Sequence, residues 1–118
     1  MKILIEVVLW NYVINYIKQV SMLIELKKFG TTLTSRDDGR EAYSAIQPTL
    51  KNISVNEGVE IDFNGVNTFT PSWGDEFITP LFKNFGDKLI LKHLDNPSVE
   101  ISLNTIEKAN KVTLNKSY

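Results

Sequence analysis

Apolar residues along the chain form two alternating patterns, namely short continuous runs and longer stretches with helical spacing. The run VEIDF at residues 59–63 lies between the turn signals Asn56-Glu57-Gly58 and Asn64-Gly65, so it predicts a buried strand inside a sheet. Two further runs, at residues 22–26 and 88–94, predict two more strands. Strands that alternate with helices are typical of an α/β domain with a largely parallel sheet.

A helix is predicted between the strand at residues 22–26 and the strand at residues 59–63, and it begins with the sequence RDDGREAYSAI. Thr34 or Ser35 supplies its cap, and two acidic residues follow in the first turn, where negative charge is favourable. Pro48 is expected to end this helix early, because proline lacks the backbone donor that the helix interior needs. Gly39 weakens the helix by about 1 kcal/mol relative to alanine, so either the helix is marginal or a partner passes close to it.

Two more helices are predicted in the second half of the chain. The helix over residues 73–85 carries six large apolar residues on one side, and Gly86 is a good C-terminal stop. Part of this side is a candidate docking face, since one small sheet does not cover so many large residues. The last helix is expected from about Ser98 to Lys108, although a strand at residues 99–103 is an alternative. The final residues, KVTLNKSY, are predicted to be frayed.

The start of the helix after residues 59–63 is the most informative position in the chain. Pro71-Ser72 opens this helix, and Asp75 follows at the spacing of a capping box. A phosphate is best tolerated on a hydroxyl at a helix N-terminus, because free N–H groups and the positive end of the dipole face it. Ser72 is therefore interpreted either as a plain cap or as a candidate switch.

The N-terminal stretch is apolar and predicts a helix over residues 7–20, although β-branched residues within 3–10 also allow a strand. Glu6 interrupts the apolar run, Asn11 and Asn15 follow it, and no small-residue cleavage pattern is present. The stretch is also too polar for a helix that spans a membrane, which needs about 20 mostly apolar residues. We therefore expect neither a secretory signal nor a membrane partner.

Composition narrows the class of protein further. The 118 residues, 42% of them hydrophobic, fit a single folded domain. The 13 basic and 14 acidic residues give a net charge of −1, which does not recruit nucleic acid by bulk electrostatics. The chain has no cysteine, so disulfides, zinc thiolate sites and thiol catalysis are excluded, and a reducing cytoplasm is the expected location.

Catalytic chemistry finds little support in the sequence. His93 is the single histidine, and no motif for a catalytic triad or a phosphate cradle accompanies it. Asp62, Asp75 and Glu76 have no metal-ligand spacing to that histidine. Asp62 is expected to be a strand-end carboxylate that caps the following turn. The sequence predicts no enzyme, no cofactor and no metal site.

Two arginines are candidate anion ligands. Arg36 and Arg40 share one helix face at i, i+4 spacing. They are either solvated charges paired with Asp37 or Glu41, or a site for a phosphate or carboxylate, whose geometry the guanidinium fork fits.

Taken together, the segments FGTTLTSRDDGREAYSAI and VEIDFNGVNTFTPSWGDEF resemble the STAS-like domain family of unknown function. The matching positions are Phe29-Gly30, Leu33, Ser35-Arg36, Asp62-Phe63, Gly65-Val66, Ser72 and Asp75-Glu76. The resemblance covers about residues 22–110, and Met22 stands where the family's first strand begins. Residues 1–21 are thus expected to be either an addition particular to this chain or the result of a translation start assigned too far upstream in the gene.

The resemblance implies a relationship to the anti-sigma-factor antagonists, which are small regulatory α/β domains. In these proteins, a partner kinase with a histidine-kinase-type ATPase fold phosphorylates the serine that starts the second helix. Ser72 falls at the matching position. The antagonist pattern is D-S-S-G-L-G, whereas this chain has T-P-S-W-G-D, so Trp73 stands where the antagonists have glycine.

These observations lead to one set of expectations. We expect an α/β STAS-like domain at residues 22–112 with a mixed four- to five-stranded sheet, an N-terminal extension at 1–21 and a tail at 113–118. The function expected is non-enzymatic partner switching with a histidine-kinase-like ATPase or serine kinase; the alternative is sensing of a small anion or nucleotide. The residues expected to bind the partner or anion are Arg36, Arg40, Asp62, Thr70, Ser72, Trp73, Asp75 and Glu76.

Overall fold

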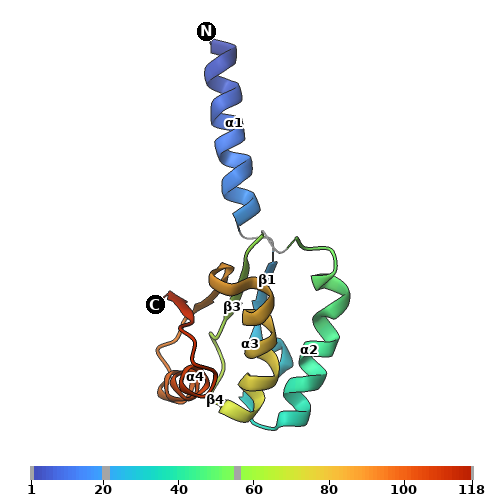
Figure 1. Ribbon diagram of the computed structural model, residues 1–118, viewed down its shortest axis with the longest axis vertical. Helices are drawn as coiled ribbons and strands as arrows, with labels where there is room; N and C mark the ends of the chain where they lie inside the picture. The colour runs from blue at the N-terminus through green and yellow to red at the C-terminus, as the bar shows by residue number, and fades with distance from the viewer. Residues whose placement is uncertain (1, 20–21, 55–56, 118) are drawn as a thin grey trace.

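Helices and strands alternate along the chain, as Figure 1 shows for the computed structural model, which describes residues 2–19, 22–54 and 57–117. The elements are α1 (Lys2–Gln19), β1 (Met22–Glu25), η1 (Leu26–Phe29), β2 (Thr32–Leu33), α2 (Arg36–Leu50), β3 (Val59–Asp62), β4 (Thr68–Phe69), α3 (Pro71–Phe85), η2 (Gly86–Lys88), β5 (Leu89–Lys92), α4 (Pro97–Asn110) and β6 (Asn115–Ser117). This confirms the predicted α/β class. Parts of the predicted helix at 7–20 and turn at 56–58 lie outside the described residues.

The main sheet has four strands in the order β1-β3-β5-β6. Every pair of neighbouring strands is parallel. The expectation of a mixed sheet is therefore wrong for the main sheet. Strand β3 is interior, as predicted, and its Val59 and Ile61 are fully buried. The prediction of a frayed tail is wrong for β6, which pairs with β5 from Asn115 to Ser117. The polar sequence of β6 carries no strand pattern, and β6 forms a strand because it pairs with β5.

A second, two-stranded sheet joins β2 to β4 in parallel and places the starts of two helices side by side. Strand β2 leads into α2, and β4 leads into α3. The N–H of Thr70 donates to the carbonyl of Leu33 (3.1 Å), and the hydroxyl of Thr70 donates to the carbonyl of Thr34 (2.7 Å). These bonds fix the first turn of α3 against the first turn of α2.

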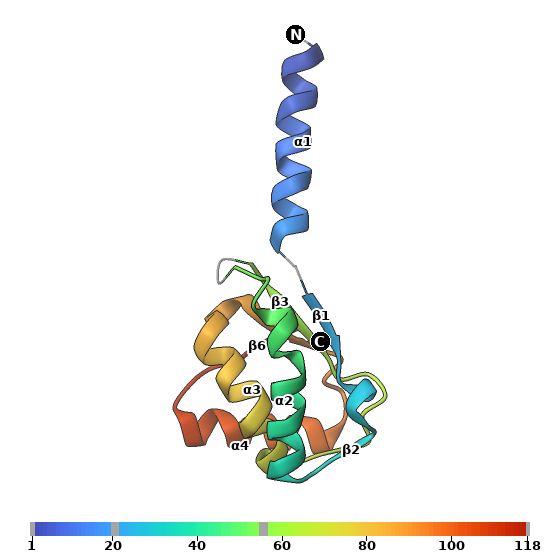
Figure 2. The ribbon, with the colours of Figure 1, turned by 90° about the vertical axis from the view of Figure 1, so that its right-hand side faces the viewer.

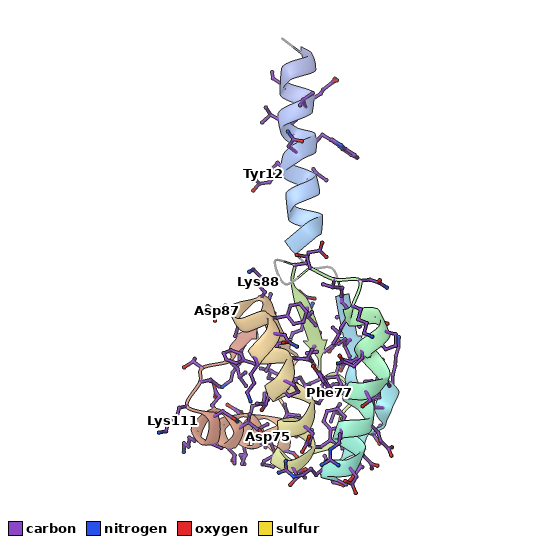
Figure 3. The ribbon with its side chains drawn as sticks, turned by 45° about the vertical axis from the view of Figure 1, so that its right-hand side comes forward. Tyr12, Asp75, Phe77, Asp87, Lys88 and Lys111 are labelled. Atoms are coloured by element: carbon purple, nitrogen blue, oxygen red, sulfur yellow. The ribbon has the colours of Figure 1, made fainter. Side chains whose placement is uncertain are left out.

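Helices α2 and α3 lie against each other over the same region of the sheet (Figures 1 and 2). A Cβ on Gly39 of α2 would lie 2.5 Å from the carbonyl oxygen of Trp73 on α3, so only glycine allows this approach. The element predicted to pass close to Gly39 is thus α3 itself. Phe77 packs on the ring of Trp73 with centroids 4.9 Å apart, and Figure 3 places Phe77 between the two helices.

The predicted early end of α2 at Pro48 was wrong. Pro48 lies inside α2, which continues to Leu50, because a proline near the C-terminus removes one backbone hydrogen bond while the buried Leu50 keeps the last turn packed. The helix predicted from about Ser98 to Lys108 is confirmed as α4, and the alternative strand at 99–103 does not form. The Nδ2 group of Asn96 also ties the start of α4 to the carbonyl of Val66 (2.9 Å).

Helix α1 rises away from the rest of the chain (Figures 1 and 2). The strand alternative at residues 3–10 is therefore wrong. Side chains of residues 5–13 are all exposed, including Trp10 at 64%, and Figure 3 shows Tyr12 directed into solvent. Within the described ranges, no helix combines the length and apolar character required to cross a membrane.

Candidate functional site

The start of α3 is built on a cap that lies two positions before Ser72, the residue that the sequence had suggested as the cap. Thr70 is the N-cap, and its hydroxyl oxygen accepts from the N–H of Trp73 at 3.4 Å. Pro71 is the first helical residue, where its fixed φ angle fits and its missing donor is not needed. Ser72 is consequently the second residue of the helix and not its cap.

Ser72 has a half-buried side chain whose hydroxyl makes no hydrogen bond in the part of the chain that the structure describes. It faces a small pocket of about 140 Å³. The pocket is lined by Arg36, Pro71, Ser72, Asp75, Thr105, Ile106 and Ala109, from α2, α3 and α4. The hydroxyl is thus available at a helix N-terminus, with a guanidinium across the pocket.

The two arginines of α2 share a face, as predicted, and both reach α3. Nη1 of Arg36 lies 3.0 Å from Oε1 of Glu76 and 3.5 Å from Oδ2 of Asp75. Nη2 of Arg40 lies 3.5 Å from the same Glu76 oxygen, and its Nη1 lies 3.2 Å from Asp37. The predicted pairing with Asp37 is confirmed for Arg40. The carboxylates of α3, which sequence spacing alone does not reveal as partners, neutralise both arginines.

These contacts shift the pKa values of the charged groups. The hydrogen bond from Arg36 is the largest cause that lowers the pKa of Glu76, and Glu76 in turn raises the pKa of Arg36. The pKa of Asp75 is lowered chiefly by the hydrogen bond from Thr79 (2.7 Å). Asp75 also accepts from Nδ2 of Asn110 on α4 (3.2 Å), so it braces α3 against α4 and does not form the predicted capping box.

Asp62 lies at the end of β3 and caps the following turn, as predicted. Its Oδ1 accepts from the N–H of Asn64 (2.8 Å) and lies 2.7 Å from Nδ1 of His93. Burial raises the pKa of Asp62, but the bond from Asn64 and the contact with His93 outweigh it, and the net shift is downwards. No hydrogen bond or ion pair among the described residues connects Asp62 to the start of α3, so it stands apart from the other candidates.

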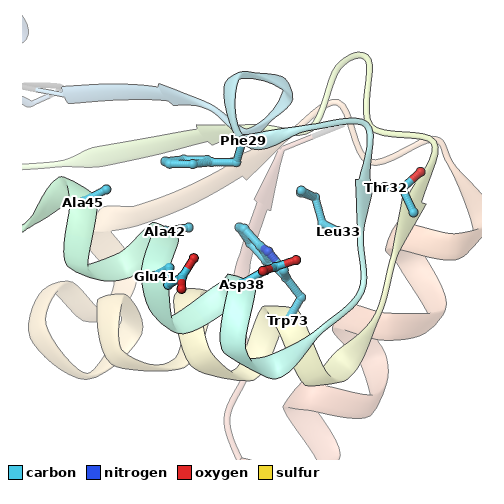
Figure 4. A pocket seen from close by; sticks show the side chains of 8 residues that line it. All are labelled: Phe29, Thr32, Leu33, Asp38, Glu41, Ala42, Ala45 and Trp73. Atoms are coloured by element: carbon cyan, nitrogen blue, oxygen red, sulfur yellow. The ribbon is translucent and has the colours of Figure 1, made fainter.

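Trp73 was expected to contact a partner, yet its side chain is only 1% exposed. It packs against Phe29, Phe69 and Phe77 in the core. One edge of Trp73 faces an open pocket of about 480 Å³ between η1, β2 and α2 (Figure 4). Sequence reasoning missed this pocket, because its walls come from four elements, η1, β2, α2 and α3, whose proximity depends on the packing of α2 on α3.

The start of α3 brings polar and charged side chains of α2 and α3 together. The described residues contain no group of histidine, cysteine or carboxylate side chains placed to hold a metal ion. What α2 and α3 present is a free hydroxyl at a helix N-terminus, two paired arginines and two pockets, one on either side of that N-terminus.

The chain thus combines a parallel four-stranded main sheet with two helices, α2 and α3, that pack closely against each other. The STAS-like domain family of unknown function matches residues 38–99, which is more than half of the chain, and the chain belongs to that family. No curated protein and no solved structure matches the chain.

Proposed function

We propose that this chain is a non-enzymatic regulatory module that binds a protein partner through the start of α3. The partner proposed is a histidine-kinase-like ATPase or a serine kinase, and the proposed location is the cytoplasm. The observation that carries the proposal is Ser72, whose hydroxyl has no hydrogen bond among the described residues and which lines a small pocket at the N-terminus of α3 together with Arg36.

A phosphate on Ser72 would change the charge balance of this surface. The kinase would transfer the γ-phosphoryl group of ATP to Oγ, and the hydroxyl proton would leave with ADP as the second product. The phosphate would meet the positive end of the α3 dipole and compete with Asp75 and Glu76 for Arg36. The same two carboxylates would repel it, so modification would rearrange the ion pairs between α2 and α3.

This rearrangement supplies a physical basis for partner switching. A partner that contacts the start of α3 would meet a paired, nearly neutral surface before modification and an anionic one afterwards. Affinity differences of about 1–3 kcal/mol are typical when one or a few charge-assisted contacts are gained or lost. The fold need not change, because the first turns of α2 and α3 are held together by Thr70 and the small sheet.

Sensing of a small anion or nucleotide has less support at this position. The volume of this pocket is about 140 Å³, whereas the volume of an ordinary ligand site is roughly 300–1,000 Å³. Arg36 is also held by two carboxylates, which a free anion would have to displace without being covalently attached.

Phosphotransfer provides the test. The chain is used to capture its partner from the native cell, and the recovered ATPase or kinase is incubated with the chain and ATP. Mass spectrometry should show one phosphate, located on Ser72 and absent from Ser72→Ala. Absence of labelling, or labelling that persists in Ser72→Ala, would contradict the role given to Ser72.

A further inference from the structure

The pocket between η1, β2 and α2 combines aromatic walls with an acidic rim. Phe29 and the edge of Trp73 form aromatic walls, and Leu33 and Ala42 add apolar surface (Figure 4). Its volume of about 480 Å³ falls in the range of sites that hold a small ligand or a large side chain. Neither lysine nor arginine lines it.

The rim charges are not neutralised. Asp38 and Glu41 stand on α2 and line the same pocket, and both are exposed. Neither carboxylate makes a hydrogen bond or ion pair in the described part of the chain; at Asp38 only the backbone N–H is engaged, by Ser35. The two arginines of α2 are already paired with Asp37, Asp75 and Glu76. Two like charges three residues apart on a helix repel each other, so a bound cation would relieve a cost that the free protein carries.

We propose that this pocket receives an arginine side chain of the protein partner. A planar guanidinium stacks on aromatic rings and donates to carboxylates in the same plane, while its methylene stem covers apolar surface. The half-buried ring of Phe29 and the exposed carboxylates of Asp38 and Glu41 offer both kinds of contact, while the buried Trp73 adds only an edge to the pocket wall. An anion would be repelled at this rim, so the occupant differs in charge from the phosphate proposed at Ser72.

The position of the pocket fits one partner that covers both sites. Ser72 and Trp73 are consecutive residues, yet Ser72 lines the pocket towards α4 and Trp73 lines the pocket towards η1. The two pockets therefore flank the start of α3. The identity of the occupant as a partner's side chain rests on the proposed function, whereas the preference for a guanidinium does not.

The preference is tested with N-acetyl-arginine amide as the probe and the full chain in ¹⁵N-¹H spectra, where the indole N–H of Trp73 and the amides of Ala42 and Ala45 report on the pocket. A dissociation constant on the order of 1 mM is expected for a ligand of this size. The neutral isostere N-acetyl-citrulline amide should bind about tenfold more weakly, because it lacks the charge-assisted hydrogen bonds.

Variants locate the effect. Asp38→Asn combined with Glu41→Gln should weaken arginine amide binding about tenfold. Ala45→Trp should block the pocket without disturbing the core, since Ala45 is exposed. Asp37→Asn is the control, because it removes one carboxylate charge in the same turn outside the pocket, and it should change affinity by less than about twofold.

Equal binding of the citrulline probe, perturbations centred elsewhere, or unchanged binding in Ala45→Trp would overturn the inference, as would the absence of any perturbation. None of these results would bear on phosphotransfer to Ser72. Conversely, if Ser72 is not phosphorylated but arginine amide binds selectively, the arginine pocket is supported and the proposed regulation through Ser72 is contradicted.

Discussion

Nη1 of Arg36 lies 3.0 Å from Oε1 of Glu76, and this contact joins the first residue of α2 to the second turn of α3. The same guanidinium faces the pocket that Ser72 lines. One ion pair thus links the packing of the two helices to the position proposed for regulation. A change of charge at Ser72 is expected to be felt first at this pair.

The ion pair predicts a pH dependence of stability. Arg36 lowers the pKa of Glu76 in the folded state below its ordinary value of 4.5. Glu76 therefore stabilises the fold above pH 4.5, and this contribution is lost as the pH falls through the lowered folded pKa. The difference in free energy of unfolding between wild type and Glu76→Gln should be present at neutral pH and vanish in acid.

Denaturant unfolding at several pH values measures this difference. Glu6→Gln serves as the control, because Glu6 is exposed on α1 and has no ion pair among the described residues. Its difference from wild type should stay near zero at every pH. A Glu76→Gln difference that does not change with pH would contradict the assignment.

The close approach of α2 to α3 predicts the effect of a single methyl group. Gly39→Ala improves helix propensity by roughly 0.5–1 kcal/mol but places Cβ against the carbonyl of Trp73, a backbone atom that cannot turn aside. We expect a net loss of about 1–3 kcal/mol in the free energy of unfolding, by denaturant titration. Ser44→Ala, at an exposed position of the same helix, should cost nothing; a stabilised Gly39→Ala would show that the helices are further apart.

The cap assignment predicts different outcomes for two neighbouring hydroxyls. Thr70→Ala removes the cap of α3 and the bond to Thr34, and it should cost about 1–2 kcal/mol of stability. Ser72→Ala removes an unbonded hydroxyl and should change stability by less than about 0.5 kcal/mol. Thermal unfolding of both variants under the same conditions checks this. Larger destabilisation from Ser72→Ala than from Thr70→Ala would restore Ser72 as the cap.

The N-terminal segment is predicted to be dispensable for folding. The described side chains of α1, residues 5–13, are all exposed and none belongs to the hydrophobic core. A chain that begins at Met22 should therefore unfold cooperatively, with a free energy of unfolding within about 0.5 kcal/mol of the full chain. Loss of cooperative unfolding in the shorter chain would show that α1 completes the core.

The main strands and helices were predictable because their signals are local. The VEIDF run between two turns defines β3, and the apolar side of residues 73–85 defines α3. Strands β2, β4 and β6 were missed, since strands of two or three residues carry no periodicity and exist only through pairing. These short strands depend on pairing with a strand that is distant in the sequence, and a local sequence pattern carries no information about that pairing.

The candidate site was predicted in its members more than in its contacts. The shared face of Arg36 and Arg40 follows from helical spacing, but their pairing with Glu76 depends on how closely Gly39 lets α3 approach. The cap was misplaced by two positions, because Pro71 occupies the first helical position and the cap is Thr70, not Ser72. Trp73 was expected among the partner-binding residues, whereas its side chain fills the core between the three aromatic rings of Phe29, Phe69 and Phe77.

The affinity of the captured ATPase or kinase for the chain, measured by isothermal titration, tests the central claim most directly. Ser72→Asp should shift the dissociation constant by about 5- to 150-fold, whereas the control Ser44→Asp, which adds the same charge at an exposed position of α2, should stay within about twofold. Equal affinities for wild type, Ser72→Asp and the phosphorylated chain would contradict the claim that the start of α3 is a regulated partner-binding surface.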